Sequence, residues 1–280
     1  MIQMHNFVHL CIYKLIIYLM EVLGYIASLF IGISLGLIGG GGSILTVPIL
    51  VYLFGINPKL ATTYSLFIVG LTAAFGSVQH YKMGNIKIKS ALYFALPSLV
   101  TLLLVRKLVL FRIPDILVLS QDYSISRSML IMILFAILMI LASYAMLKPQ
   151  AESLTTPVTK PFQLAFIGAI VGVITGFLGA GGGFLIIPTL LFFAKMHMKQ
   201  AIGTSLMIIA FNSLIGFLGD VINNVIVDYY FILSITVVAG IGVYLGSILS
   251  QKIEGAKLKP LFGGFVLLMG IYIIVKEVFL

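Results

Sequence analysis

Long apolar stretches alternate with short polar or glycine-containing breaks along the whole chain. Ten of them can be delimited: 22–38, 43–55, 60–80, 88–105, 128–147, 162–178, 184–195, 200–219, 229–250 and 260–279. A helix of about 20 apolar residues, rising about 1.5 Å per residue, crosses the roughly 30 Å hydrocarbon core of a bilayer. The pattern therefore predicts an all-α polytopic membrane protein, with the lipid bilayer as its surroundings.

Two of the stretches, 43–55 and 184–195, are too short to cross a bilayer. Each follows a run of glycines, which costs a helix about 1 kcal/mol per residue relative to alanine. Backbone that is freed at membrane depth must be satisfied by protein or must line a wet cavity. We therefore expect broken or half-length helices at the glycine-rich clusters, near the middle of the bilayer.

The chain also contains an internal repeat. Residues 36–48 (GLIGGGGSILTVP) recur as residues 176–188 (GFLGAGGGFLIIP), at an offset of 140 residues. Downstream, the same offset aligns Ser65 with Ser205 and Gly76 with Gly216, which shared apolarity alone does not explain. This divides the chain into a first transmembrane repeat (20–148), an inter-repeat loop (149–161) and a second transmembrane repeat (162–280). Residues 1–19 are either an N-terminal extension or a mis-called start upstream of Met20.

Loop charge bears on how the halves are oriented. The loop after 60–80 carries Lys82, Lys87 and Lys89, whereas its counterpart in the second half carries Asp220 and Asp228. Because cytoplasmic loops are enriched in lysine and arginine, these two loops are expected on opposite sides. The basic segment 106–127 disagrees, but it has no counterpart of equal length and reads as an insertion. We therefore favour inverted repeats over parallel ones.

The glycine clusters are the candidate binding site. A helix N-terminus combined with a glycine nest binds anions, and two of them meeting at the midplane would form a substrate site. Polar residues buried in the stretches 60–80 and 200–219 could line the same pathway. The expected site residues are Gly39, Gly40, Gly41, Gly42, Ser43, Ser65, Gly179, Gly181, Gly182, Gly183, Thr204, Ser205 and Asn212. The alternative interpretation is close helix packing, which small residues also serve in membranes.

Composition narrows the class of function. The chain is 61% hydrophobic and only 9% charged, so its net charge of +9 reflects loop residues and not a nucleic-acid partner. The single cysteine, Cys11, excludes a cysteine metal cluster. No nucleophile–base pair appears, and no acid falls in the middle of a predicted span, which disfavours a cation pump. We expect no enzyme activity, no metal and no cofactor.

The two motifs resemble the paired signature of the sulfite exporter (TauE/SafE-type) membrane proteins. The similarity rests on the two glycine runs ending at Pro48 and Pro188, on residues 201–206 (AIGTSL) and on residues 84–86 (GNI). It implies a multi-pass permease of the cell (inner) membrane for a small anion, often sulfite, a sulfonate or a related organosulfur acid. Residues 62–65 (TTYS) depart from the Gly-Thr-Ser form seen at 203–205.

Three functions stay open at this point. The leading one is a secondary transporter that binds a small anion between the two glycine clusters and rocks its halves around it. An anion channel on the same site is the second, and a membrane scaffold without transport is the third. The expected partners are the anion and the bilayer, and homo-oligomer formation is left open.

Overall fold

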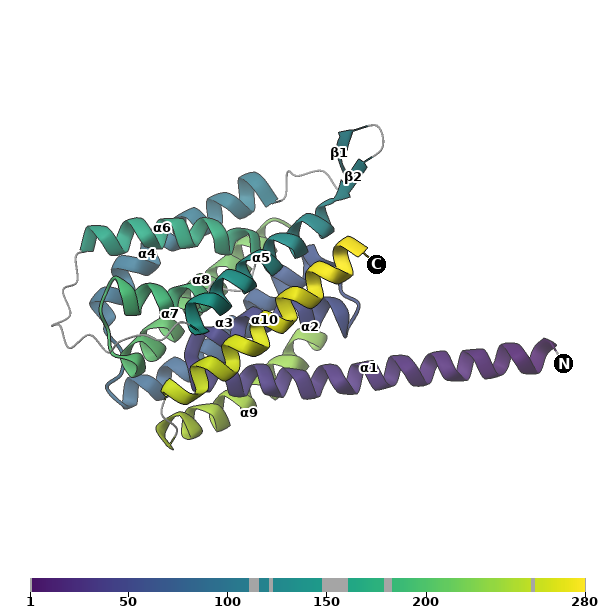
Figure 1. The fold of residues 1–280 in the computed structure, drawn as a ribbon, viewed down its shortest axis with the longest axis horizontal. Coiled ribbons are helices and arrows are strands. Elements are labelled where there is room, and N and C mark those ends of the chain that lie inside the picture. The colour runs from purple at the N-terminus through teal and green to yellow at the C-terminus, as the bar shows by residue number, and fades with distance from the viewer. Residues whose placement is uncertain are drawn as a thin grey trace.

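A computed structural model describes residues 2–110, 116–120, 123–147, 161–178, 183–252 and 255–279. Of residues 2–18 it describes only the backbone path. The described part is almost entirely helical (Figure 1). The all-α expectation is therefore confirmed in outline.

The first half begins with α1 (Ile2–Ile38), followed by a 3₁₀ segment η1 (Gly39–Leu45) and the short α2 (Thr46–Tyr52). It continues with α3 (Pro58–Lys82), α4 (Ile88–Val105) and a π-helical turn η2 (Arg106–Leu110). A hairpin of β1 (Ile116–Ser120) and β2 (Tyr123–Ser126) precedes α5 (Arg127–Leu147). The hairpin lies in the segment that reads as an insertion, and it is a feature that the sequence pattern did not predict.

The second half repeats the order without the hairpin. It consists of α6 (Pro161–Leu178), α7 (Gly183–Phe192), α8 (Met198–Ile222), α9 (Tyr229–Lys252) and α10 (Gly255–Phe279). α2 and α7 are the short helices that the two short apolar stretches predict. Pro58 starts α3 after Asn57, whose side-chain oxygen accepts the backbone N–H of Lys59, a usual N-terminal arrangement.

Five described helical segments are long and apolar enough to cross a membrane. They are Leu19–Ile38, Pro58–Lys82, Ile88–Leu108, Met198–Ile222 and Tyr229–Ser250. Their outer faces expose large apolar side chains such as Phe30, Leu96 and Leu233. Such side chains are costly in water and suited to lipid, which agrees with a membrane protein.

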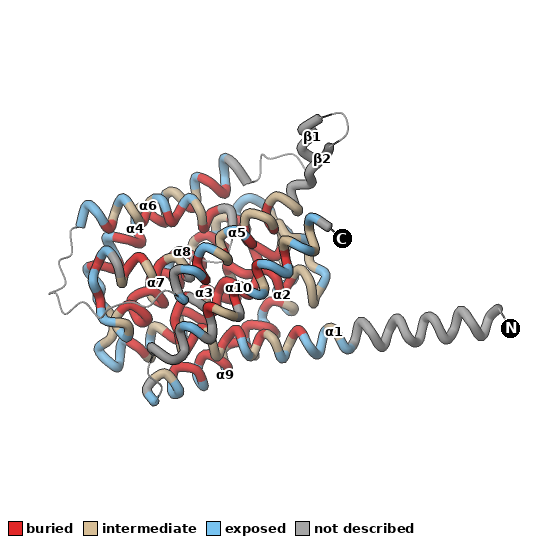
Figure 2. The backbone as a smooth tube through the Cα atoms, viewed as in Figure 1, coloured by how far each residue is buried: buried red, intermediate tan, exposed pale blue. Residues whose placement is uncertain are grey.

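The helices of the two halves pack crosswise. α1 packs against α9 and α4 against α6, while α3 packs against α8 and α5 against α10. Exchanging each helix for its repeat partner leaves this set of pairs unchanged. α3 and α8 carry much of the buried surface at the centre (Figure 2).

The contact between α3 and α8 is reciprocal. Gly76 of α3 faces Leu206 of α8, and Gly216 of α8 faces Leu66 of α3. The two equivalent helices therefore run antiparallel. Small residues at these crossings allow the close approach that membrane helices need.

Candidate functional site

The two glycine clusters are in contact through a buried residue of each. Gly40 of η1 lies so close to Gly183, the first residue of α7, that a Cβ atom on either would overlap backbone atoms of the other. Gly39 has φ +73°, a left-handed conformation that glycine adopts without strain. A Cβ on Gly39 would lie 2.9 Å from Ser205 Oγ. The structure thus brings Gly39, Gly40, Gly183 and Ser205 together.

The rest of the clusters is described in part. Gly42 is buried against α1, where a Cβ would reach Leu35 N at 2.5 Å. Gly41 belongs to η1, but its surroundings lie outside the described residues. Gly179, Gly181 and Gly182 also lie outside the described residues, so their part in the site stays a prediction.

The predicted hydroxyl and amide residues are all fully buried but have different neighbours. Ser43 Oγ donates to Gly40 O at 2.7 Å, and Ser205 Oγ donates to Ile202 O at 2.8 Å, so both hydroxyls are used locally. Ser65, the repeat counterpart of Ser205, has no hydrogen-bond partner for its Oγ among the described residues. Ser65 therefore keeps a free donor inside the protein.

Two predicted site residues make contacts away from the glycines. Thr204 Oγ1 accepts the backbone N–H of Lys87, in the loop between α3 and α4, at 3.0 Å. Asn212 Nδ2 donates to Ser98 Oγ of α4 at 2.7 Å, while its Oδ1 has no partner among the described residues. The structure thus gives Thr204 and Asn212 tertiary contacts that do not involve the glycine clusters.

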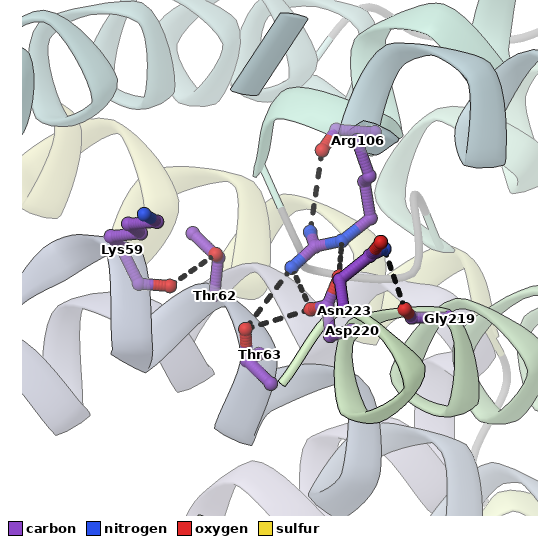
Figure 3. A network of polar contacts seen from close by, with 8 residues as sticks. Lys59, Thr62, Thr63, Arg106, Gly219, Asp220 and Asn223 are labelled. Carbon is purple, nitrogen blue, oxygen red and sulfur yellow. Dashed lines mark hydrogen bonds and ion pairs between the residues drawn. The ribbon is translucent and has the colours of Figure 1, made fainter. Parts of the chain in front are cut away.

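A buried ion pair forms a second polar centre, which the sequence pattern did not predict. Arg106 of η2 reaches Asp220 of α8 with two nitrogens: Nε donates to Oδ1 at 2.7 Å, and Nη2 contacts Oδ2 (Figure 3). The side chains of Arg106 and Asp220 are 2% and 1% exposed. Thr63 Oγ1 of α3 donates to Asp220 Oδ2 at 2.7 Å, and Arg106 Nη1 donates to Gly176 O of α6 at 3.3 Å. One guanidinium thereby connects four helices.

A cavity of about 190 Å³ adjoins this ion pair. Arg106, Lys107 and Asp220 line it, together with Gly216, Gly219 and Asn223. Lys107 is exposed, whereas the other two charged residues are buried. The cavity therefore leads from the surface to a buried guanidinium and carboxylate.

The position of Asp220 corrects an expectation from the sequence. The apolar pattern ends the stretch at 219 and leaves Asp220 in the loop, but α8 continues to Ile222 and Asp220 is fully buried in it. Likewise Arg106 is a buried ion-pair partner and not a loop charge. The only sign of this ion pair in the sequence is a charged residue directly after each of the apolar stretches 88–105 and 200–219.

Comparison with known proteins identifies the family. The family model described as sulfite exporter TauE/SafE matches residues 24–273. A probable membrane transporter protein of Xylella fastidiosa (strain Temecula1 / ATCC 700964) is 31% identical over 261 residues, covering 87% of this chain and 91% of the relative. A probable membrane transporter protein of Bacillus subtilis (strain 168) is 26% identical over 252 residues, covering 88% and 97%. No solved structure matches the chain. The chain belongs to the sulfite exporter TauE/SafE family.

Proposed function

We propose that the protein is a secondary transporter that moves a small anion across the cell (inner) membrane. Sulfite is the anion that the family description names, and the proposed substrate is sulfite, a sulfonate or a related organosulfur anion. The relatives named as probable membrane transporter proteins match most of this chain, which supports a transport function for the whole molecule. The contact of Gly40 with Gly183 is the observation that carries the proposal.

The proposed transporter is built from inverted repeats. Antiparallel packing of α3 on α8 supports this arrangement, because repeat-equivalent helices run in opposite directions when one half is turned over. η1 with α2, and α7, are the proposed half-length elements, with the glycine contact near the middle of the bilayer. The two-fold axis of such a molecule passes between α3 and α8.

In this mechanism the anion binds where the two glycine clusters now touch. α7 begins at Gly183, and the backbone N–H groups of its first turn lack helical partners. Ser205 lies beside Gly39, and its repeat counterpart Ser65 has an unused hydroxyl donor. The contact is closed in this structure, so entry of the anion requires the halves to separate. Rocking of one half against the other would open each side in turn.

The test is uptake of radiolabelled sulfite, thiosulfate and methanesulfonate into proteoliposomes. Wild-type protein is expected to take up at least one of them saturably and to show counterflow. Gly40→Ala is expected to abolish uptake, because its methyl group would overlap Gly183. Gly240→Ala is the matched control, since no atom lies within 4 Å of a Cβ at that position, and it should transport normally.

The channel alternative has its own outcome. Steady anion conductance without counterflow would indicate a channel on the same site. No uptake of the three anions by inserted, folded wild-type protein would contradict the proposed substrate class. Because Gly40→Ala risks misfolding, Ser205→Ala is the second variant: its hydroxyl bonds only within its own helix, so loss of anion affinity without loss of stability would place Ser205 in the site.

A further inference from the structure

The ion pair between Arg106 and Asp220 is hard to explain by stability alone. Transfer of two charges into a protein interior costs several kcal/mol per ion, and well-packed apolar residues of similar volume often stabilise a protein as well or better. Ionisable residues inside membrane segments are correspondingly rare and are usually functional. Both residues lie within helical segments long enough to span a membrane, Ile88–Leu108 and Met198–Ile222.

The geometry around Asp220 is that of an oxyanion site. Arg106 presents Nε and Nη2 to the two carboxylate oxygens, and the Thr63 hydroxyl donates to Oδ2 at 2.7 Å. A guanidinium can donate two parallel N–H bonds to a pair of oxygens, which a carboxylate, a sulfonate and sulfite each provide. Asp220 thus occupies, as part of the chain, the position that a free oxyanion would take.

A cavity adjoins the buried pair. Its lining is mostly apolar and includes Leu103 and Ile222, and its charged members are Arg106, Lys107 and Asp220. At about 190 Å³ it is far larger than one water molecule requires. Lys107 is exposed where it lines the cavity, and so can attract an anion from solution.

The pair lies near the ends of its helices and not at the glycine contact. Arg106 follows the last residue of α4, Asp220 stands in the last turn of α8, and Thr63 is in the second turn of α3. Arg106 also holds the carbonyl of Gly176, the residue that begins the second glycine-rich run. Breaking the pair would therefore remove the polar contacts that join α8 and α3 to the end of α4.

The other half of the molecule has no such pair at the equivalent place. At the repeat offset, His80 corresponds to Asp220 and Gly246 corresponds to Arg106. His80 is 2% exposed. The ion pair therefore distinguishes one end of a two-fold arrangement from the other.

We propose that Arg106 is an anion receptor at one mouth of the transport pathway and that Asp220 is its built-in competitor. An oxyanion that enters the cavity replaces the Asp220 carboxylate on Arg106, and the loss of that contact frees α8 so that this mouth opens. The inference rests on the proposed transport function and adds a second anion site, at the pathway entrance, to the central one.

The test is equilibrium binding of radiolabelled sulfite to the purified full-length protein, with methanesulfonate as a competitor. Asp220→Asn removes the competing charge and leaves Arg106 unpaired, so its Kd for sulfite should fall about tenfold, equivalent to about 1.4 kcal/mol. Arg106→Lys keeps the charge but loses the bidentate geometry and should bind more weakly than wild type. Asp228→Asn is the matched control, because Asp228 is exposed and its carboxylate accepts the N–H of Phe231 in a local cap, and its Kd should be unchanged.

A double variant separates function from folding. Arg106→Met with Asp220→Leu replaces the pair by apolar side chains, which buried pairs usually tolerate. The folded double variant is expected to lose sulfite binding at this mouth and most uptake. If Asp220→Asn binds sulfite like wild type and the double variant still transports, the pair is structural and the inference is wrong, while the transport proposal stands. If wild-type protein neither binds nor transports any of the three anions, both proposals fail.

Discussion

Some buried polar residues of the predicted site form hydrogen bonds within their own segment, and others form them with a different element. Ser43 and Ser205 bond carbonyls of their own segment, whereas Thr204 and Asn212 bond other elements. A sequence cannot distinguish the two cases, because each requires only a buried polar side chain on a helix. The types and burial of these residues were predictable, but their partners were not.

Thr204 offers a prediction at this scale. Thr204→Val keeps the shape but removes the acceptor for the backbone N–H of Lys87, so the apparent melting temperature should fall by an amount equivalent to about 1 kcal/mol. Thr236→Val is the control, since its hydroxyl bonds only Ile232 O of the same helix. Equal shifts for the two variants in thermal unfolding would contradict a bridging role for Thr204.

The ion pair shows why a residue-level prediction failed. Arg106 and Asp220 are 114 residues apart, in different halves, and each ends an apolar stretch. A charge at such a place is normally a loop charge facing water. The two side chains meet only because α4 packs against α8, and the spacing of residues along the sequence does not predict that packing.

Elements were more predictable than residues. The apolar stretches 60–80 and 88–105 correspond to α3 (Pro58–Lys82) and α4 (Ile88–Val105), because each is bounded by proline, glycine or charge. The short stretches gave α2 and α7 for the same reason. The sequence did not predict the hairpin of β1 and β2. Its strands have only five and four residues, which is too short for an alternating pattern that could be told apart from the neighbouring apolar helices.

The contact between α4 and α6 gives a prediction at the element scale. A Cβ on Gly172 of α6 would overlap Ser98 O and Thr101 Oγ1 of α4. Gly172→Ala should therefore destabilise the protein by about 1–3 kcal/mol through overpacking. Gly240→Ala should be neutral or slightly stabilising, because alanine favours a helix and the position is open. Thermal unfolding of both variants in the same detergent measures the difference, and a stable Gly172→Ala protein would refute the close α4–α6 contact.

The whole molecule is predicted to place equivalent loops on opposite sides of the membrane. Met83, after α3, and Ile226, before α9, are both exposed. In a Cys11→Ala background, Met83→Cys and Ile226→Cys should each react with a membrane-impermeant thiol reagent from one side only, and from opposite sides. Reaction from the same side would mean parallel repeats and would remove the two-fold mechanism.

The asymmetry of the ion pair has a consequence for direction. If only one mouth of the pathway has an arginine from which the anion must displace Asp220, the anion concentration that gives half-maximal transport differs between the two sides of the membrane. Such a carrier favours one direction only kinetically: at equal electrochemical potential of the anion on both sides the net flux is still zero, because the equilibrium is fixed by the gradients alone. When the anion is present mainly on one side, however, transport in one direction saturates at a lower anion concentration than transport in the other. The two repeats would thus carry out the transport of the anion. The Arg106–Asp220 pair, which occurs in one repeat arrangement only, would set the anion concentrations at which transport is fast.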